Sequence, residues 1–173
     1  MMLANGILTR FPITREKFAW INQPMAGGGY EDEYRVYVEA GITIEGSELN
    51  VGTTHMSYTH KFESTPEKQV EADLLLKELS RHKTSFIFSG DLNALPGSYT
   101  IEKVGSILHG AGPDFAEKTW TTKPFSYNGF KETDLNWRLD YVFATDDIKF
   151  DSSKILSTGY SDHLPIYVQF ALN

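Results

Sequence analysis

The sequence predicts an α/β fold, on the evidence of a buried strand, a helix that precedes it, and polar residues at the strand's end. Residues 86–88 (Phe-Ile-Phe) form an apolar run bounded by Gly90, as expected for a buried strand. A helix expected from Thr65-Pro66 onward links this strand to an earlier one that ends in Thr54-His55. Such a helical crossover is typical of α/β proteins.

Length and composition indicate one globular domain over residues 1–173. The chain is 40% hydrophobic and 13% aromatic, which is typical of folded proteins. No apolar run approaches the ~18 residues of a membrane span, and Met1 to Arg10 do not form a signal peptide. The absence of cysteine excludes disulfides, thiolate metal sites and thiol nucleophiles; the compartment stays open, with a cytoplasmic location favoured. The net charge of −7 argues against an extended basic groove for nucleic acid. It does not exclude a small basic patch, because some of the acidic residues can be committed to a metal site.

The N-terminal third is expected to be mainly β-structure. Residues 7–13 predict a short strand that runs into a turn at Pro12, and the three glycines 27–29 predict a flexible loop. Alternating patterns over 34–44 and 49–53 predict a hairpin. Arg35 at its start is a candidate for contacting phosphate. His55 at its end is either an ordinary surface residue or a catalytic one.

Two helices are expected around the buried strand. Pro66 suits the first turn of the longer helix, and Ser64 with Glu67 fits a capping box. Four apolar residues are expected to face the core and four charged ones to face solvent, namely Val70, Leu74, Leu75 and Leu79 against Glu67, Lys68, Glu71 and Lys77. His82, between Arg81 and Lys83, predicts a solvated cluster at the helix end. A short second helix is expected after Ser98, with Ile101, Val104 and Leu108 facing inward.

Asp91 and Asn93 follow the buried strand at positions i and i+2. On extended backbone these side chains point to the same side, at the sheet edge where α/β folds commonly place ligands. A carboxylate beside an amide can align a water and hold an oxyanion or a metal. The alternative is an ordinary turn, because Gly, Asp and Asn are turn formers.

The irregular stretch 109–136 is a second place where function is expected, since long loops in compact domains are often functional. Trp120 and Lys123 are candidates for stacking on a ligand and for contributing a positive charge. The alternative is that the aromatic residues of this stretch pack the loop onto the core.

The last third contains one acidic residue inside a strand and one acidic residue beside a histidine. Residues 137–143 alternate as a strand, with Asp140 among them. A buried Asp there requires a histidine, an arginine or a metal as partner. Residues 161–163 (Ser-Asp-His) precede a terminal strand over 166–170. Consecutive residues cannot form the geometry of a catalytic triad. An arrangement in which Asp162 ligates a metal and His163 contacts a phosphate is physically simpler, since neighbouring side chains can flank one reacting group.

Together these motifs resemble the endonuclease/exonuclease/phosphatase superfamily, which includes pancreatic-type deoxyribonuclease. The resemblance spans nearly the whole chain and rests on segments in the family's order: 8–13 (LTRFPI), 54–55 (TH), 90–93 (GDLN), 138–143 (RLDYVF) and 161–165 (SDHLP). It implies a four-layer α/β sandwich of the deoxyribonuclease I type, with two mixed β-sheets flanked by helices. It also implies Mg²⁺- or Mn²⁺-dependent hydrolysis of a phosphoester by in-line attack of water.

The resemblance also implies roles for individual residues. Asp91 would orient or deprotonate the water, and Asn93 would help hold the water and the phosphate. Asp162 would ligate the metal. His163, positioned by Asp140, would contact the scissile phosphate, and His55 would lie near the leaving group.

One departure from the family pattern concerns the beginning of the domain. Family members open with a strand ending in Asn and a later strand carrying a metal-binding Glu, and neither precedes residue 8 here. The expectation is therefore an N-terminally truncated member in which losing a carboxylate weakens metal binding. Phosphodiester cleavage is favoured over monoester cleavage, on nucleic acid, a phospholipid headgroup or a small phosphate ester. The alternative is a catalytically silent member that acts as a binding or regulatory domain, and self-association through exposed sheet surface is a further expectation.

Overall fold

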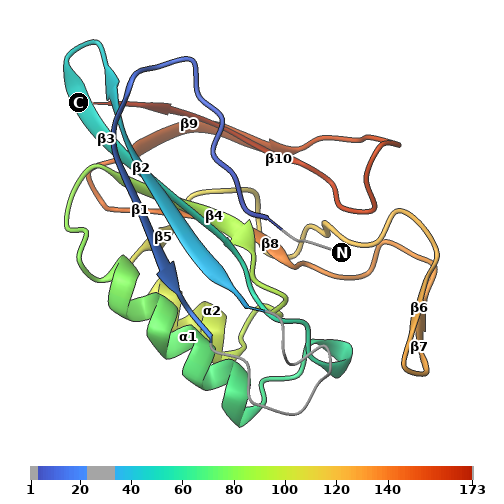
Figure 1. Ribbon diagram of the computed structural model, residues 1–173. Helices are drawn as coiled ribbons and strands as arrows, with labels where there is room; N and C mark the ends of the chain where they lie inside the picture. The colour runs from blue at the N-terminus through green and yellow to red at the C-terminus, as the bar shows by residue number, and fades with distance from the viewer. Residues whose placement is uncertain (1–3, 23–33, 173) are drawn as a thin grey trace.

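The computed structural model describes residues 4–22 and 34–172, and these residues form an α/β sandwich (Figure 1). Its centre is a six-stranded mixed sheet in the order β1-β2-β3-β4-β8-β5. The strands are β1 (Ile13–Trp20), β2 (Val36–Ile44), β3 (Ser47–His55), β4 (Phe86–Asp91), β8 (Asp140–Ala144) and β5 (His109–Gly110). Only β3 and β4 pair in parallel, through the crossover helix α1 (Pro66–Leu79). The glycines 27–29 lie outside the described residues.

Each face of the central sheet is covered by a different layer. Helices α1 and α2 (Tyr99–Gly105) pack on one face, and the antiparallel pair β9 (Lys149–Ile155) and β10 (Ile166–Ala171) packs on the other (Figure 1). A small hairpin, β6 (Phe125–Tyr127) and β7 (Phe130–Glu132), and the 3-10 turn η2 (His60–Phe62) complete the elements. The expected α/β sandwich is confirmed, and residues 4–22 and 34–172 form a helical layer, the central sheet and the β9–β10 layer (Figure 1). None of the helices in these two ranges is long and apolar enough to cross a membrane.

The hairpin, the crossover and the second helix form as the sequence predicts. Strands β2 and β3 pair antiparallel from Tyr37↔Thr54 to Ile44↔Ser47. In α2 the buried residues include Ile101 and Val104, with Leu108 buried just beyond its end.

The strand predicted over residues 7–13 is wrong except for its last residue. Residues 7–12 are irregular, and β1 starts at Ile13. The Thr9 hydroxyl accepts the Phe11 N–H at 3.0 Å, and Pro12 has no N–H to donate to a ladder. The chain therefore joins the sheet only after the proline.

The predicted buried face of α1 is confirmed at Leu75 and Leu79 but wrong at the other positions. Val70 and Leu74 are exposed, whereas Lys68, Glu71 and Glu78 are buried together with Ala72, Leu75 and Leu79. The helix is rotated because three of its charged side chains have partners inside the molecule, among them Lys17 for Glu78. The cap also differs, since the Thr65 hydroxyl, not Ser64, accepts the Lys68 N–H.

His82 is not in a solvated cluster. Its ring stacks on Phe86 with centroids 3.9 Å apart, and its Nε2 lies 2.9 Å from Glu39 Oε2. Glu39, buried in β2, also accepts hydrogen bonds from Tyr37 and Arg15. Burial alone would raise the pKa of Glu39, but the hydrogen bonds from His82 and Tyr37 outweigh it and lower the pKa to about 2.

Glu39→Gln is therefore expected to destabilise the fold by roughly 3 kcal/mol at pH 7. A carboxylate with a depressed folded-state pKa stabilises the protein above its unfolded pKa, and this stability is lost as the pH falls towards 2. The difference between wild type and variant should accordingly shrink between pH 5 and pH 3. Urea unfolding at both pH values measures it, with the exposed β3 variant Glu48→Gln as control. An equal effect of both variants would contradict the prediction.

Candidate active site

Three neighbouring strands place polar residues in one row at their ends. In the sheet register His55 of β3 pairs with Asp91 of β4, and Asp91 pairs with Asp140 of β8. Because β8 runs antiparallel to β4, it begins where β4 ends. Gly90 permits the close approach of β3 and β4, since a Cβ at this position would lie 2.2 Å from the Thr54 carbonyl oxygen. The row of His55, Asp91 and Asp140 thus follows directly from the topology.

The Asp91 carboxylate lies at the centre of this row. Its Oδ2 is 3.4 Å from His55 Nε2 and 3.7 Å from His163 Nε2. Its Oδ1 accepts the Asn93 N–H at 2.9 Å. Burial and the nearby charge of Asp140 raise the pKa of Asp91 well above its usual range. The side chain is consequently a stronger base than a solvated carboxylate.

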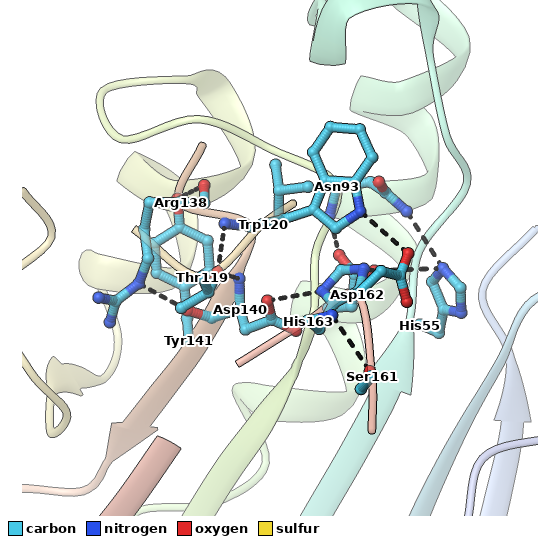
Figure 2. Close-up of polar contacts among 12 residues, drawn as sticks. His55, Asn93, Thr119, Trp120, Arg138, Asp140, Tyr141, Ser161, Asp162 and His163 are labelled. Atoms are coloured by element: carbon cyan, nitrogen blue, oxygen red, sulfur yellow. Dashed lines mark hydrogen bonds and ion pairs between the residues drawn. The ribbon is translucent and has the colours of Figure 1, made fainter. Parts of the chain in front are cut away.

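Asp140 and His163 form a close ion pair (Figure 2). His163 Nδ1 lies 2.9 Å from Asp140 Oδ2. Burial opposes protonation of the ring, but the hydrogen bond to Asp140 and the charges of Asp140 and Asp91 raise the pKa of His163 to about 9. At neutral pH His163 is therefore a cation whose Nδ1–H is held by Asp140 and whose Nε2–H is directed into the site.

His55 has the opposite character. Burial, together with the positive charges of Arg35 and His163, lowers the pKa of His55 to about 4, so the ring is neutral at pH 7. Asn93 Nδ2 lies 3.2 Å from His55 Nε2 and donates to the Met56 carbonyl oxygen at 2.9 Å. Asn93 is buried and adopts a left-handed φ of 44°, a conformation that asparagine tolerates better than most residues. Its amide nitrogen thus ties the end of β3 to the loop after β4.

Asp162 is exposed and is oriented by the indole of Trp120. The Trp120 Nε1–H donates to Asp162 Oδ2 at 3.2 Å, and the Thr122 N–H donates to the Asp162 carbonyl oxygen. Trp120 itself is only 4% exposed and packs edge-on against Phe62 and Phe125. The ring is therefore not available as a stacking surface, which corrects the expected role of Trp120. Of the two sequence-based interpretations, packing of the loop onto the core fits this residue.

The other two substrate-binding candidates lie on either side of this cluster. Lys123 is exposed, and its Nζ donates to the Tyr160 carbonyl oxygen at 3.3 Å, close in sequence to Asp162. Arg35 is buried and lines a small pocket with Asn5, Tyr34, Val36 and His55. The structure places Arg35 beside His55 and Lys123 on the loop next to Asp162.

Several positioning groups carry no recognisable signal in the sequence. The Thr119 hydroxyl accepts the backbone N–H of Asp140 at 3.2 Å and that of Leu139 at 3.1 Å. The fully buried Arg138 donates to the Asp140 carbonyl oxygen at 2.7 Å (Figure 2). A threonine in an irregular loop and an arginine in a strand are each ordinary, and only the fold shows that both hold Asp140.

A cleft of about 400 Å³ opens beside the ion pair. Asp91, Asp140 and His163 line one part of it, and residues 164–166 line another. Its size falls within the range of small-molecule sites, about 300–1,000 Å³. The charged cluster therefore faces a space that can admit a ligand.

The acidic and histidine side chains of the site include possible ligands for a metal ion. Ligand atoms of Asp91, Asp140 and His163 lie within 4.8 Å of one another. Asp140 and His163 are bonded to each other, however, and a protonated imidazole cannot ligate a cation. The carboxylates of Asp91 and Asp162 are the hard oxygen donors that Mg²⁺ and Mn²⁺ prefer. The residues present are thus compatible with a hard divalent cation.

The chain is similar in fold to several solved structures at low sequence identity. A mannosyl-6-phosphatase from Bacteroides thetaiotaomicron VPI-5482 superposes with a TM-score of 0.69 at 20% identity, over 94% of this chain and 67% of the other. D. rerio TDP2 in complex with a single-stranded DNA product superposes with a TM-score of 0.68 at 18% identity, over 94% of this chain and 69% of the other. The human Nocturnin catalytic domain with a bound sulfate anion superposes with a TM-score of 0.67 at 18% identity, over 95% of this chain and 61% of the other. The chain therefore spans about two thirds of the length of these structures.

Sequence comparison identifies the family. No curated protein matches the chain. Residues 4–163 match the sequence profile of the endonuclease/exonuclease/phosphatase family, which covers most of the 173 residues and includes every residue of the cluster described above. The match agrees with the α/β sandwich and with the structural neighbours, which share this fold. The protein belongs to the endonuclease/exonuclease/phosphatase family.

Proposed function

We propose that the protein is a divalent-metal-dependent phosphoesterase that cleaves phosphodiesters by in-line attack of water. The observation that carries this proposal is the Asp140–His163 ion pair next to the Asp91 carboxylate. It places a cationic hydrogen-bond donor and a raised-pKa carboxylate on one ligand-sized cleft. Such a donor can stabilise the charge of a phosphate, and such a carboxylate can accept a proton from an attacking water.

The roles of the residues follow from their protonation states. The His163 Nε2–H donates to a non-bridging phosphate oxygen and stabilises its charge. Asp91 accepts a proton from the attacking water as the water oxygen bonds to phosphorus and the opposite P–O bond breaks. The released alkoxide takes up a proton from solvent. Asp140 keeps His163 charged and oriented, while Asn93 and neutral His55 hold the geometry around Asp91.

Asp162 would hold the metal ion. When bound, Mg²⁺ or Mn²⁺ supplies positive charge that offsets the charge of the phosphate. Trp120 fixes the Asp162 carboxylate through its indole N–H.

Trp120→Phe is therefore expected to raise the Mn²⁺ concentration for half-maximal activity by up to about tenfold, the equivalent of one hydrogen bond. The aromatic packing is retained, so the melting temperature should change little. Phe125→Leu, which alters the same aromatic cluster without touching Asp162, serves as the control. An unchanged metal dependence in Trp120→Phe would contradict the role of the indole.

A diester is favoured over a monoester by the charge of the site. Asp91, Asp140 and Asp162 are acidic, and His163 is the cation in direct contact with Asp140. A monoester dianion is repelled more strongly by this set than a diester monoanion. Nucleic acid, a phospholipid headgroup and a small ester all offer such a group. Rates on bis(p-nitrophenyl) phosphate and p-nitrophenyl phosphate, each with Mg²⁺ or Mn²⁺, test the proposal; faster monoester turnover would overturn the preference.

The second candidate function is a catalytically silent binding domain. It is favoured because, in the described part of the chain, the single clustered set of potential metal ligands contains the bonded pair Asp140 and His163. A silent domain would bind a phosphodiester, seen as shifts of the His163 ring signals in NMR, without turning it over. Turnover that is lost in His163→Ala would exclude it.

We also propose self-association through the outer part of the central sheet. β1 is an edge strand of this sheet, and its Phe18 and Trp20 are 66% and 51% exposed. Exposed apolar edges favour pairing with another chain. Light scattering of wild type and a Phe18→Ser/Trp20→Ser variant tests it: the proposal requires a dimer in the wild type and a monomer in the variant.

A further inference from the structure

Two buried charged side chains of α1 have no role in the mechanism described above. Lys68 and Glu71 are 2% and 3% exposed. They lie one helical turn apart, and both reach the loop that follows β3. Burial of two such side chains is unusual unless their polar atoms have partners.

Both partners belong to one residue, Ser57. Lys68 Nζ donates to the Ser57 carbonyl oxygen, and Glu71 Oε1 accepts the Ser57 N–H at 2.9 Å. One turn of α1 therefore holds both backbone polar groups of Ser57. Asn22 Nδ2 also donates to the Ser57 hydroxyl at 3.0 Å, from the segment after β1.

Ser57 is two residues from His55, and the residue between them connects it to the rest of the site. The Met56 carbonyl oxygen accepts the Asn93 amide, and the Met56 N–H donates to the Asp91 carbonyl oxygen. Residues 55–57 are thus fixed on one side by the loop after β4 and on the other by α1. A shift of Ser57 must move either His55 or the acceptor of Asn93.

We propose that Lys68 and Glu71 are positioning residues, which hold His55 and Asn93 in their active arrangement by fixing both backbone groups of Ser57. The inference rests on the proposed phosphoesterase function for its effect on turnover. The geometric part concerns the arrangement of His55 and Asn93 and can be measured without activity.

The hydrogen bonds of Lys68 and Glu71 restrict the movement of the Ser57 backbone. Loss of either side chain leaves a partly buried backbone group of Ser57 without its hydrogen-bond partner, which is unfavourable. The loop can avoid this cost only by moving the Ser57 peptide toward water. A displacement of about 1 Å near reacting groups can reduce a rate by as much as about 100-fold.

The test compares variants that keep or remove each hydrogen bond. Lys68→Met and Glu71→Leu remove one bond each, whereas Lys68→Arg and Glu71→Gln retain a donor or an acceptor. Lys77→Met, on the exposed side of the same helix, is the matched control. The readouts are kcat and KM for bis(p-nitrophenyl) phosphate, and the NMR signals of the Asn93 side-chain amide and the His55 ring.

The expected result is a kcat about 10- to 100-fold lower in Lys68→Met and Glu71→Leu, with KM changed less than threefold. Lys68→Arg and Glu71→Gln should recover most of the kcat, and Lys77→Met should match the wild type. The Asn93 and His55 signals should shift strongly in Lys68→Met and Glu71→Leu, slightly in Lys68→Arg and Glu71→Gln, and not in Lys77→Met. If Lys68→Met and Glu71→Leu do not fold, the inference is tested on Lys68→Arg and Glu71→Gln. It then requires small shifts of the Asn93 and His55 signals in both, relative to Lys77→Met.

Wild-type Asn93 and His55 signals in a folded Lys68→Met or Glu71→Leu protein would overturn the inference, as would equal losses of kcat in Lys77→Met. An inactive wild type with shifted signals in the variants would instead refute the phosphoesterase function and leave the positioning role standing.

Discussion

His163→Ala is expected to lower kcat/KM for a phosphodiester by about 10³-fold, the typical cost of losing a preorganised charged donor. The ring supplies the positive charge next to Asp91, and its pKa of about 9 keeps it protonated across neutral pH. Alanine removes both the donor and the charge. Steady-state rates with saturating Mn²⁺ measure the loss.

The conservative comparison for this variant is Asp140→Asn. Asparagine can still accept the Nδ1–H of His163 at the 2.9 Å distance, but it no longer stabilises the charge. We expect Asp140→Asn to lie between wild type and His163→Ala, and to lose activity at a lower pH on the alkaline side because the pKa of His163 falls. A His163→Ala protein that is folded and retains more than a tenth of the activity would contradict the role of His163.

Removal of divalent metal is expected to abolish turnover, and Asp162→Asn should raise the Mn²⁺ requirement by about 10- to 100-fold. Asp162 offers a hard oxygen ligand on the exposed side of the site, and its amide analogue is a weaker ligand for the ion. Rates in EDTA, followed by titration with Mg²⁺ or Mn²⁺, measure both effects.

The matched control is Asp151→Asn, another exposed carboxylate, which lies on β9. Asp151→Asn should require the same Mn²⁺ concentration for activity as the wild type. Full activity in EDTA, or the same metal requirement in Asp162→Asn and Asp151→Asn, would contradict the assignment of Asp162.

Local patterns in the sequence predict some of the elements that build the central sheet. The β2–β3 hairpin and the strand of residues 86–88 have clear periodicity and turn signals, and the structure confirms them. The buried face of α1 could not be predicted from apolar spacing, because Lys68, Glu71 and Glu78 are buried through polar contacts with distant residues. His82 was misassigned for the same reason, since its partner Glu39 lies 43 positions away.

Residues of the candidate site can be predicted from the sequence only where a polar residue type stands at a telling position, such as the end of a strand or the middle of an apolar run. Asp91 and Asn93 follow a strand, and Asp140 stands inside an apolar run, so their chemistry is visible in the sequence. Thr119, Arg138 and Lys68 act through backbone groups, and such contacts depend on the fold and not on local pattern. The burial of Trp120 cannot be predicted from local pattern either, because it depends on the aromatic cluster around Phe62.

The most direct test of the central claim is hydrolysis of bis(p-nitrophenyl) phosphate in ¹⁸O-labelled water with Mg²⁺, followed by ³¹P NMR of the product. Attack of water at phosphorus predicts one ¹⁸O atom in the monoester product, with formation of this product stopped by EDTA and by His163→Ala. Product without ¹⁸O on phosphorus, or the same yield in EDTA or in His163→Ala, would contradict metal-dependent phosphodiester hydrolysis at this site.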